Sequence, residues 1–241
     1  MVSFDDINVY EKVYHEDYVP TPVKPAGEEK YTVGMNICSQ WRNGTHWGWS
    51  TISAYDDIHP VLGYYDEGSP ESADWEFKMM VEHGIDFLAF CWYPENTNAP
   101  IKNPGYNYQL YDGFMYAEYS DMMDYCLIWE CANAGKPANM DAWKNYYVPY
   151  FIENFFKEER YLKLDNKPVL AVFGSSALAS SLGGSSALNE AFAYLEEEVK
   201  KLGFDGMVYL SSHSNSGIAA MGFDGFVAYN WGNTGYSLDV N

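Results

Sequence analysis

The sequence predicts an α/β protein whose fold class is a (β/α)8 TIM barrel, and three observations indicate this fold. Short apolar runs rich in aromatic and β-branched residues alternate with stretches of helical spacing, as strands and helices do in a parallel sheet. The clearest runs are apolar almost throughout, which is typical of strands buried on both faces. Aromatic and ionisable residues follow nearly every run. A barrel gathers such residues at one rim, whereas an open doubly wound sheet, the alternative, uses a single switch point.

Six segments have the pattern of a strand. The clearest are residues 85–92 (IDFLAFCW) and 168–173 (PVLAVF). The complete set of strand candidates is 31–38, 85–92, 125–130, 168–173, 207–211 and 226–231. Because a closed barrel needs eight strands, we expect a barrel that is truncated after about six βα units, with two further units beyond Asn241.

Helix candidates occupy the intervals between the strands: residues 70–82, 108–119, 142–156, 187–202 and a short turn near 218–221. Ser69 followed by Pro70 is typical of an N-cap and a first helical residue. Residues 174–186 (GSSALASSLGGSS) follow a strand but have neither a Lys-Ser/Thr ending nor a GxGxxG pattern. We therefore expect a flexible loop at the rim and not a phosphate-binding loop.

A three-residue signature recurs where helices are expected to end. Its copies are Gly84-Ile85-Asp86, Gly203-Phe204-Asp205 and Gly222-Phe223-Asp224. Each glycine can take the positive φ of a helix C-cap, after which an apolar residue leads into the next strand. This recurrence favours repeated βα units.

The chain divides into two predicted regions. Residues 1–30 are polar and acidic and contain Pro20, Pro22 and Pro25, so we expect an extended lead-in segment or linker. We expect residues 31–241 to form the incomplete barrel. No run approaches the roughly 18 apolar residues of a membrane span, and the first ten residues do not resemble a signal peptide. The sequence therefore predicts no membrane partner.

Charge and composition exclude several classes of function. The 34 acidic and 14 basic residues give a net charge of −20, which would repel nucleic acid. The five histidines are scattered without the spacing of metal ligands, so we expect neither a metal nor another cofactor. The four cysteines form no CxxC pair, and we expect buried free thiols. Thiols of this kind leave the compartment open, and we favour an extracellular or periplasmic location over a cytoplasmic one.

The aromatic and polar residues at the predicted rim are typical of a saccharide site. Flat rings cover the C–H side of a pyranose, while carboxylate, amide and imidazole groups bond its hydroxyls. The candidates at the strand ends are Trp41, Trp92, Tyr93, Trp129, Glu130, His213 and Trp231. The loop after the first strand candidate, residues 41–65, is also dense in aromatic residues, and long loops tend to be functional. The alternative is that these rings only pack the loop onto the barrel.

Glu130 is the most prominent carboxylate. An apolar strand ends in this residue, and a pocket poor in water could tune it for acid/base chemistry or hold it against a hydroxyl. The alternative is an ion pair with Lys136 or Arg160. Asp66 and Glu67 follow Tyr65 in a turn before the next helix, and either could instead favour that helix N-terminus electrostatically.

Four segments, taken in order, resemble the glycoside hydrolase family 99-like group, which includes endo-mannosidases and WbsX-type proteins of polysaccharide loci. These segments are residues 61–68 (VLGYYDEG), 84–93 (GIDFLAFCWY), 125–130 (YCLIWE) and 160–170 (RYLKLDNKPVL). The resemblance extends over residues 31–231.

The resemblance implies a (β/α)8 barrel that hydrolyses α-mannoside-type or related linkages inside an oligo- or polysaccharide, without a metal. It also implies a catalytic Glu pair late in the barrel, in a segment like Asn-Glu-Trp-x-Glu that is absent here, so we expect that pair beyond the chain and the 241 residues alone to be inactive. Glu130 matches the substrate-contacting carboxylate after the third strand. The endo-mannosidases continue there with Pro-Tyr, where this chain has Cys131-Ala132.

By the same match, five residues fall where the family lines its −1 and neighbouring subsites: His59, Tyr65, Asp66, Trp92 and Tyr93. Two other functions stay open. One is a non-catalytic carbohydrate-binding or polysaccharide-biosynthesis protein of the WbsX type. The other is a doubly wound enzyme that uses a nucleotide, for which no phosphate-binding glycine pattern is present.

Overall fold

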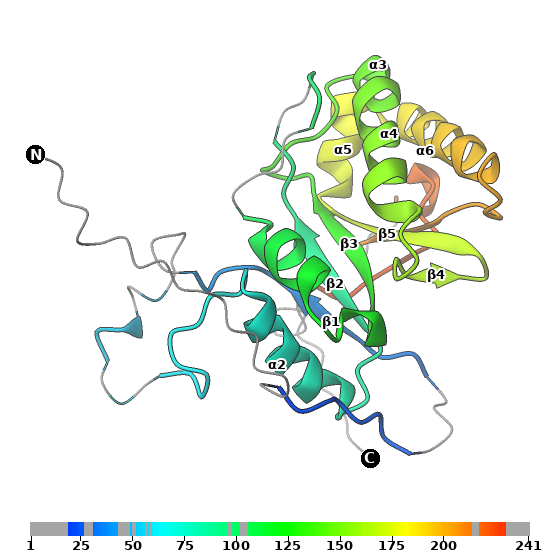
Figure 1. Cartoon of the computed structure of the whole chain (residues 1–241). Helices are drawn as coiled ribbons and strands as arrows, with labels where there is room; N and C mark the ends of the chain where they lie inside the picture. Colours follow the sequence, from blue (N-terminus) through cyan, green and yellow to red (C-terminus); the bar gives the residue numbers. More distant parts are fainter. Residues whose placement is uncertain are drawn as a thin grey trace, which may run out of the picture.

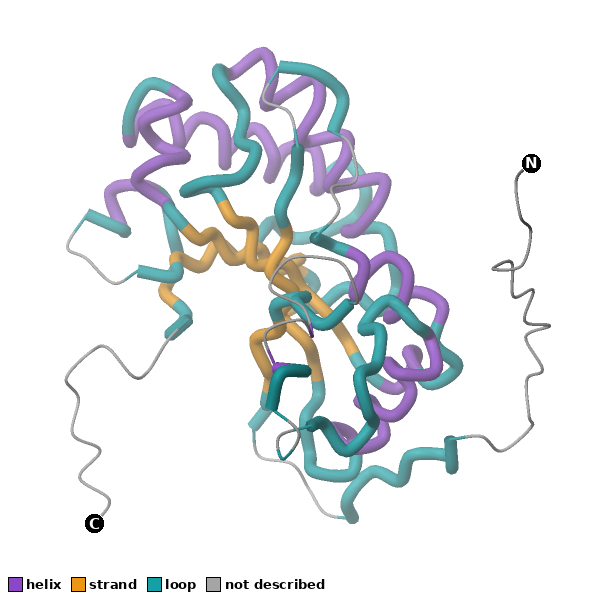
Figure 2. Tube along the Cα trace, turned by 90° about the vertical axis from the view of Figure 1, so that its left-hand side faces the viewer, coloured by secondary structure: helices purple, strands orange, loops and turns teal. Residues whose placement is uncertain are grey.

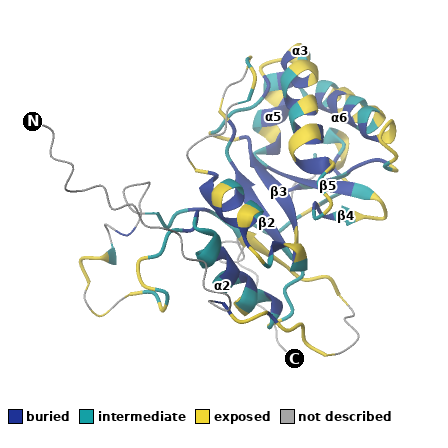
Figure 3. Cartoon of the chain, in the orientation of Figure 1, coloured by how far each residue is buried: buried dark blue, intermediate teal, exposed yellow. Residues whose placement is uncertain are grey.

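The computed structural model describes residues 19–26, 31–42, 49, 52–55, 57, 59–95, 98–101, 106–213 and 217–229. In this part of the chain a curved parallel sheet forms the centre (Figure 1). Helices form an arc along one face of the sheet, as the view turned by 90° shows (Figure 2). The central strands of the sheet consist mostly of buried residues (Figure 3).

The parallel strands are β1 (Gly34–Ile37), β2 (Phe87–Trp92), β3 (Asp124–Glu130), β5 (Lys167–Phe173), β6 (Val208–Ser211) and β7 (Gly225–Phe226). They lie in the spatial order β1-β2-β3-β5-β6-β7, and each adjacent pair is parallel. Chain order and spatial order coincide, as in a barrel, whereas the order reverses in a doubly wound sheet. The predicted fold class is confirmed as a curved parallel sheet of the barrel type.

A short strand was not predicted from the sequence. This strand, β4 (Lys163–Leu164), pairs antiparallel with the start of β5. Asp165 and Asn166 join the two strands with φ values of 49° and 58°. Two consecutive residues with positive φ are typical of a type I′ hairpin turn, and Asp and Asn tolerate this conformation well.

The helical segments are α2 (Pro70–Val81), α3 (Met140–Ala142), α4 (Val148–Phe151), α5 (Ser175–Leu182) and α6 (Ser185–Lys200), with short 3₁₀ turns at Phe114–Tyr116, Ser120–Met122 and Ala219–Met221. The described part of the chain also contains short π-helical stretches at Gln109–Gly113, Trp143–Tyr147 and Ile152–Phe156. The last two stretches join α3 and α4 into one continuous helix across residues 140–156. Pro149 lies inside it, and because proline lacks an N–H, the regular i→i−4 ladder cannot continue there.

Two predictions for the helices and loops were wrong. Residues 174–186 are not a loop, because Gly174 (φ 87°) and Gly183 (φ 110°) flank α5, which buries Leu178 and Leu182 one turn apart. The many serines conceal that apolar spacing. Residues 108–119 do not form one long helix but a π turn followed by 3₁₀ turns. At the last strand only Gly225–Phe226 pairs, and residues 230 and 231 lie outside the described part.

The recurring Gly-apolar-Asp signature is confirmed as a helix-to-strand joint. Gly84, Gly203 and Gly222 have φ values of 75°, 95° and 87°. The N–H of the following apolar residue donates to a carbonyl five residues earlier in all three copies: Ile85 to Met80, Phe204 to Val199 and Phe223 to Ile218. This bond is the Schellman pattern, which satisfies a carbonyl at the end of the helix.

The aspartate of the signature has a role that the sequence did not reveal. Asp86 Oδ2 accepts from the Val33 backbone N–H at 2.8 Å, and Asp224 Oδ2 accepts from the Tyr209 N–H at 2.8 Å. In the third copy, Asp205 Oδ2 accepts from the Asn166 side chain at 3.0 Å. Each aspartate therefore connects the start of its own strand to the preceding strand and helps to set the register. None of the described helices is long and apolar enough to cross a bilayer.

Candidate functional site

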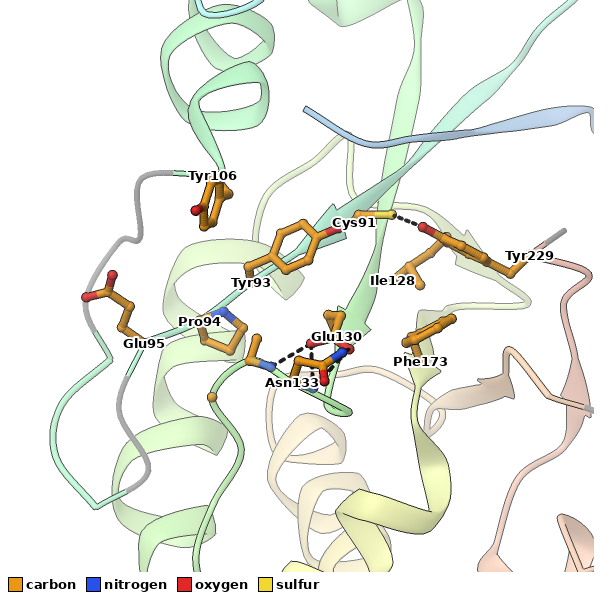
Figure 4. A pocket seen from close by; sticks show the side chains of 12 residues that line it. Cys91, Tyr93, Pro94, Glu95, Tyr106, Ile128, Glu130, Asn133, Phe173 and Tyr229 are labelled. Atoms are coloured by element: carbon orange, nitrogen blue, oxygen red, sulfur yellow. Dashed lines mark hydrogen bonds between the residues drawn. The ribbon is translucent and has the colours of Figure 1, made fainter. Parts of the chain in front are cut away.

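A pocket of about 550 Å³ opens at the carboxyl-terminal ends of β2, β3 and β5 (Figure 4). The strands and the segments that follow them supply its walls. The lining residues are Cys91, Tyr93, Pro94, Glu95, Tyr106, Ile128, Glu130, Asn133, Ala134, Gly135, Phe173 and Tyr229. The pocket lies at the rim where a barrel fold carries its functional residues.

The alternation of side chains along the strands decides which residues reach the pocket. In β3, Ile128 and Glu130 face it, while Trp129 between them faces the helices. In β2, Cys91 faces the pocket and Trp92 faces the helices. Successive residues of a strand point to opposite faces, so a residue at the end of a strand is not automatically a site residue.

Glu130 lies at the base of the pocket with 7% of its surface exposed. Its Oε1 accepts from the Ala132 N–H at 3.1 Å, the Asn133 N–H at 3.1 Å and the Asn133 Nδ2 at 3.3 Å. Its Oε2 accepts from the Asn133 N–H at 3.0 Å and the Ala134 N–H at 2.6 Å. The partners are N–H groups, as in an anion-binding nest. Among the described residues Glu130 forms no ion pair with Lys136 or Arg160, and Arg160 bonds Glu158 at 2.9 Å instead.

Neighbouring strands hold the loop that forms this nest. The Cys131 N–H donates to the Phe173 carbonyl at 2.7 Å, and the Gly135 N–H donates to the Pro94 carbonyl at 2.7 Å. Gly174 lies so close that a Cβ on it would be 2.7 Å from the Ala132 nitrogen. The orientation of the Glu130 carboxylate is therefore set by β2 and β5 as well as by its own strand.

The rings of Tyr93, Phe173 and Tyr229 lie around the space above the carboxylate, and the Tyr106 ring lies beyond Tyr93 (Figure 4). The Phe173 and Tyr229 ring centroids are 4.9 Å apart, and those of Tyr93 and Tyr106 are 6.1 Å apart. Figure 4 shows the rings around the space above Glu130. Buried Asn107 holds Tyr93 in place, since its Oδ1 accepts from the Tyr93 N–H at 3.1 Å and its Nδ2 donates to the Tyr93 carbonyl at 3.4 Å.

Two thiols contact the tyrosine hydroxyls of the pocket. The Cys38 Sγ lies 3.1 Å from the Tyr93 hydroxyl, and the Cys91 Sγ lies 3.5 Å from the Tyr229 hydroxyl. Burial raises the pKa of Tyr93 and of Tyr229. A hydrogen bond with the Cys38 thiol, together with burial, raises the pKa of Cys91. These groups therefore stay protonated and neutral at pH 7. All four cysteines are free thiols, and three of them are buried.

The structure brings some of the predicted site residues together. Tyr93 and Glu130 line the pocket, and the His213 ring lies 5.0 Å from the Phe173 ring at its edge. The Trp92 and Trp129 predictions were wrong, because both side chains are 0% exposed on the opposite face of the sheet. Their rings pack against the helix of residues 140–156. Trp231 lies outside the described part of the chain.

The residues predicted in the loop after β1 do not line the pocket. The Trp41 ring stacks on the Trp49 ring at 4.5 Å, and the Trp49 Nε1 donates to the Tyr65 carbonyl at 2.6 Å. Asp66 Oδ1 accepts from Arg42 Nε at 2.8 Å. His59 is exposed. Trp41, Trp49 and Tyr65 of this loop therefore pack against one another, while Tyr55 and Tyr64 are exposed.

Several lining residues were missed from the sequence. Cys91 and Ile128 precede Tyr93 and Glu130 by two positions, so the period of two along a strand could have identified them. Phe173 ends its strand in the same way as Glu130. Tyr229 carried no such signal, since it meets Cys91 across 138 residues of sequence.

A second pair of acids lies near the loop after β1, in which Glu67 is buried and Glu76 is half-buried. Glu67 Oε2 accepts from the Gln40 N–H at 2.7 Å and the Trp41 N–H at 2.8 Å. Glu76 accepts from the Gln109 Nε2 at 3.2 Å. Burial raises the pKa of Glu67 to about 7, and burial with the charge of Glu67 raises the pKa of Glu76 to about 7. The described residues contain no group of three His, Cys, Asp or Glu side chains that could hold a metal ion.

Comparison with known proteins gives both a family and a fold. A family model described as "Glycosyltransferase WbsX" matches residues 53–238. Two structures of the GH99 endo-alpha-mannosidase from Bacteroides thetaiotaomicron are similar. The one in complex with BIS-TRIS-Propane has a TM-score of 0.50 at 18% identity, covering 72% of this chain and 50% of that one. The other has a TM-score of 0.51 at 17% identity, with 70% and 46% covered.

A third structure, described as a glycoside hydrolase-like protein, has a TM-score of 0.50 at 16% identity and covers 80% of this chain and 55% of that one. The chain thus spans about half the length of the structures that it matches. None of the curated proteins matches it. At these identities the likeness shows a shared fold, that of the GH99 barrel.

Proposed function

The chain belongs to the WbsX family, and from this premise we propose that it is the saccharide-binding part of a glycan-processing protein of the glycoside hydrolase type. One observation carries the proposal. A buried carboxylate, Glu130, is held by backbone N–H groups at the base of a pocket lined with aromatic rings. The pocket lies at the rim that a barrel enzyme uses for its substrate.

The proposed mode of binding follows from the chemistry of the lining. The rings of Tyr93, Phe173 and Tyr229 would cover the C–H face of a sugar ring. The Glu130 carboxylate, already oriented, would accept from a sugar hydroxyl, and the exposed Asn133 side chain would bond a second one. A carboxylate that is oriented before the ligand arrives loses little conformational entropy on binding.

We propose that the substrate is an oligo- or polysaccharide with α-mannoside or related linkages, cleaved inside the chain. The family and the structural neighbours support this class. Glycoside hydrolysis needs two carboxyl groups that flank the scissile bond. In the pocket Glu95 points away from Glu130 (Figure 4). We therefore assign Glu130 to substrate binding and the proton transfers to residues outside the described part.

The test is a binding titration of α-linked manno-oligosaccharides with the 241-residue chain. Glu130→Gln keeps the size of the side chain but replaces a charged acceptor, so we expect the affinity to fall about tenfold or more. Glu159→Gln removes one negative charge from an exposed site and should leave the affinity unchanged. Equal affinities for the wild type and Glu130→Gln would remove the basis of the proposal. Hydrolysis is read separately, as shortened oligosaccharides.

A second candidate is a non-catalytic carbohydrate-binding or polysaccharide-biosynthesis protein. The description of the matching family as a glycosyltransferase favours it, as does a Glu130 carboxylate whose two oxygens already accept five hydrogen bonds. The two candidates differ in one result. Binding of manno-oligosaccharides without cleavage would favour the second candidate, and cleavage would favour the first.

A further inference from the structure

We propose that the pocket selects saccharide units by charge. A unit that carries a free ammonium group would bind more tightly than its neutral counterpart, and a unit that carries an anionic group would bind most weakly. This inference rests on the proposed saccharide binding and adds the chemical class of the ligand. It stands on the charges, the rings and the donors that meet in the pocket.

The described lining of the pocket carries negative charge. Among the described residues that line it, the charged side chains are Glu95 and Glu130, and both are acidic. Lys136 follows the loop in sequence, but it is not one of the lining residues. The hydroxyls of Tyr93 and Tyr229 stay neutral because burial raises their pKa values. Within the described lining a ligand therefore meets two acidic side chains and no basic one, and His213 lies at the edge of the pocket against Phe173.

The aromatic rings of the pocket lie close to the Glu130 carboxylate. Tyr93, Phe173 and Tyr229 lie around the space above Glu130, with Tyr106 beyond Tyr93 (Figure 4). The face of an aromatic ring carries negative charge density and attracts ammonium groups within about 6 Å of the ring centre. Rings around a carboxylate form a cage that suits a cation. A carboxylate or phosphate in the same place would be repelled by Glu130 and by the ring faces.

The backbone N–H donors at the base of the pocket are already occupied. The N–H groups of Ala132, Asn133 and Ala134 could hold an anionic ligand, but they already bond Glu130. These donors are therefore not available to an anionic ligand, and the group that faces the pocket is the Glu130 carboxylate, a hydrogen-bond acceptor. The net charge of −20 further lowers the local concentration of any anionic glycan.

The experiment is a set of protein-observed NMR titrations of the 241-residue chain with matched sugars. The probes are mannosamine, N-acetylmannosamine, mannose and mannuronate, and tetramethylammonium serves as a cation without a sugar. At about pH 6 we expect mannosamine to bind about tenfold more tightly than mannose. This advantage should vanish at about pH 10, where the amine is neutral. N-acetylmannosamine should behave like mannose, and mannuronate should bind more weakly than mannose.

Variants assign the effect to the pocket. Tyr229→Leu removes one ring of the cage and should reduce the preference for mannosamine, whereas Tyr229→Phe keeps the ring and should retain it. Glu130→Gln should abolish the differences in affinity among mannosamine, mannose and mannuronate. Glu159→Gln changes the net charge by the same amount at the surface and should preserve these differences. Circular dichroism checks that each variant is folded, and the pair at Tyr229 keeps the test decisive if Glu130→Gln unfolds.

The outcomes separate this inference from the proposed function. If the sugars bind with equal affinities whatever their charge, the charge selection is wrong and saccharide binding stands. If tetramethylammonium binds in a manner that depends on Glu130 and no sugar binds, the cation site stands and the saccharide function is wrong. If neither the sugars nor tetramethylammonium bind, both proposals fail.

Discussion

At the scale of single residues, the pocket depends on side chains that cannot touch a ligand. Asn107 is 2% exposed and bonds both backbone groups of Tyr93, so it fixes the ring that lines the pocket. Gly174 leaves room for the loop that binds Glu130. A ligand would contact Tyr93 and Glu130, but Asn107 and Gly174, which lie behind them, set the positions of these two side chains.

The close approach at Gly174 leads to a prediction. Gly174→Ala should destabilise the protein by about 2–4 kcal/mol and weaken saccharide binding, because the new Cβ would lie 2.7 Å from the Ala132 nitrogen at a φ of 87°. Chemical denaturation and the binding titration measure the two effects.

Gly203→Ala is the matched control for this prediction. Gly203 has a similar φ of 95° but nothing lies within 4 Å of the Cβ position. Its substitution should cost only about 1 kcal/mol and leave binding intact. If both variants lose the same stability and Gly174→Ala binds normally, the contact with the loop has no role in the site.

At the scale of elements, the joints between helices and strands explain why the sequence pattern was informative. Each Gly-apolar-Asp signature ends a helix by a bond between residues five positions apart, so the helix end follows from local sequence, whereas its aspartate bonds a residue 15 to 53 positions away. The α5 helix shows the opposite case. Its Ser-rich sequence resembles a loop, but the burial of Leu178 and Leu182 against the rest of the protein stabilises it as a helix.

Glu67 and Glu76, near the loop after β1, predict that the free energy of unfolding depends on pH. The folded-state pKa values of Glu67 and Glu76, each about 7, lie above those of an unfolded chain, so the folded state binds more protons. Stability should therefore fall as the pH rises from about 4.5 to about 7, by roughly 1–3 kcal/mol.

Glu76→Gln checks this prediction. The neutral side chain can still bond Gln109 and Tyr65 but carries no charge. It should raise the free energy of unfolding at pH 8 and flatten its dependence on pH, as measured by urea denaturation at several pH values. The matched variant Glu153→Gln, at an exposed position, should behave like the wild type. A steeper pH dependence in Glu76→Gln would contradict the assignment.

At the scale of the whole molecule, a net charge of −20 acts on every part of the chain. Like charges repel one another in the compact state, and salt screens this repulsion. Raising sodium chloride from about 10 mM to about 200 mM should therefore increase the melting temperature by about 2–5 °C.

Differential scanning calorimetry measures this shift. Sucrose of the same osmolality is the control, because it alters the solvent without screening charge. A melting temperature that does not respond to salt would mean that the local ion pairs, such as Arg42 with Asp66, balance the excess of acidic groups.

The sequence alone determined the order of the βα units, the helix ends at the three Gly-apolar-Asp joints and the position of Glu130 after an apolar strand. These features follow from local patterns, in which period, capping and turn chemistry act within a few residues. Only the tertiary structure decided which face each strand-end residue takes. A parallel sheet is buried on both faces, so apolar character does not show that Trp92 and Trp129 face the helices while Tyr93 and Glu130 face the pocket. The meeting of Tyr229 with Cys91 likewise depends on the packing of the whole sheet.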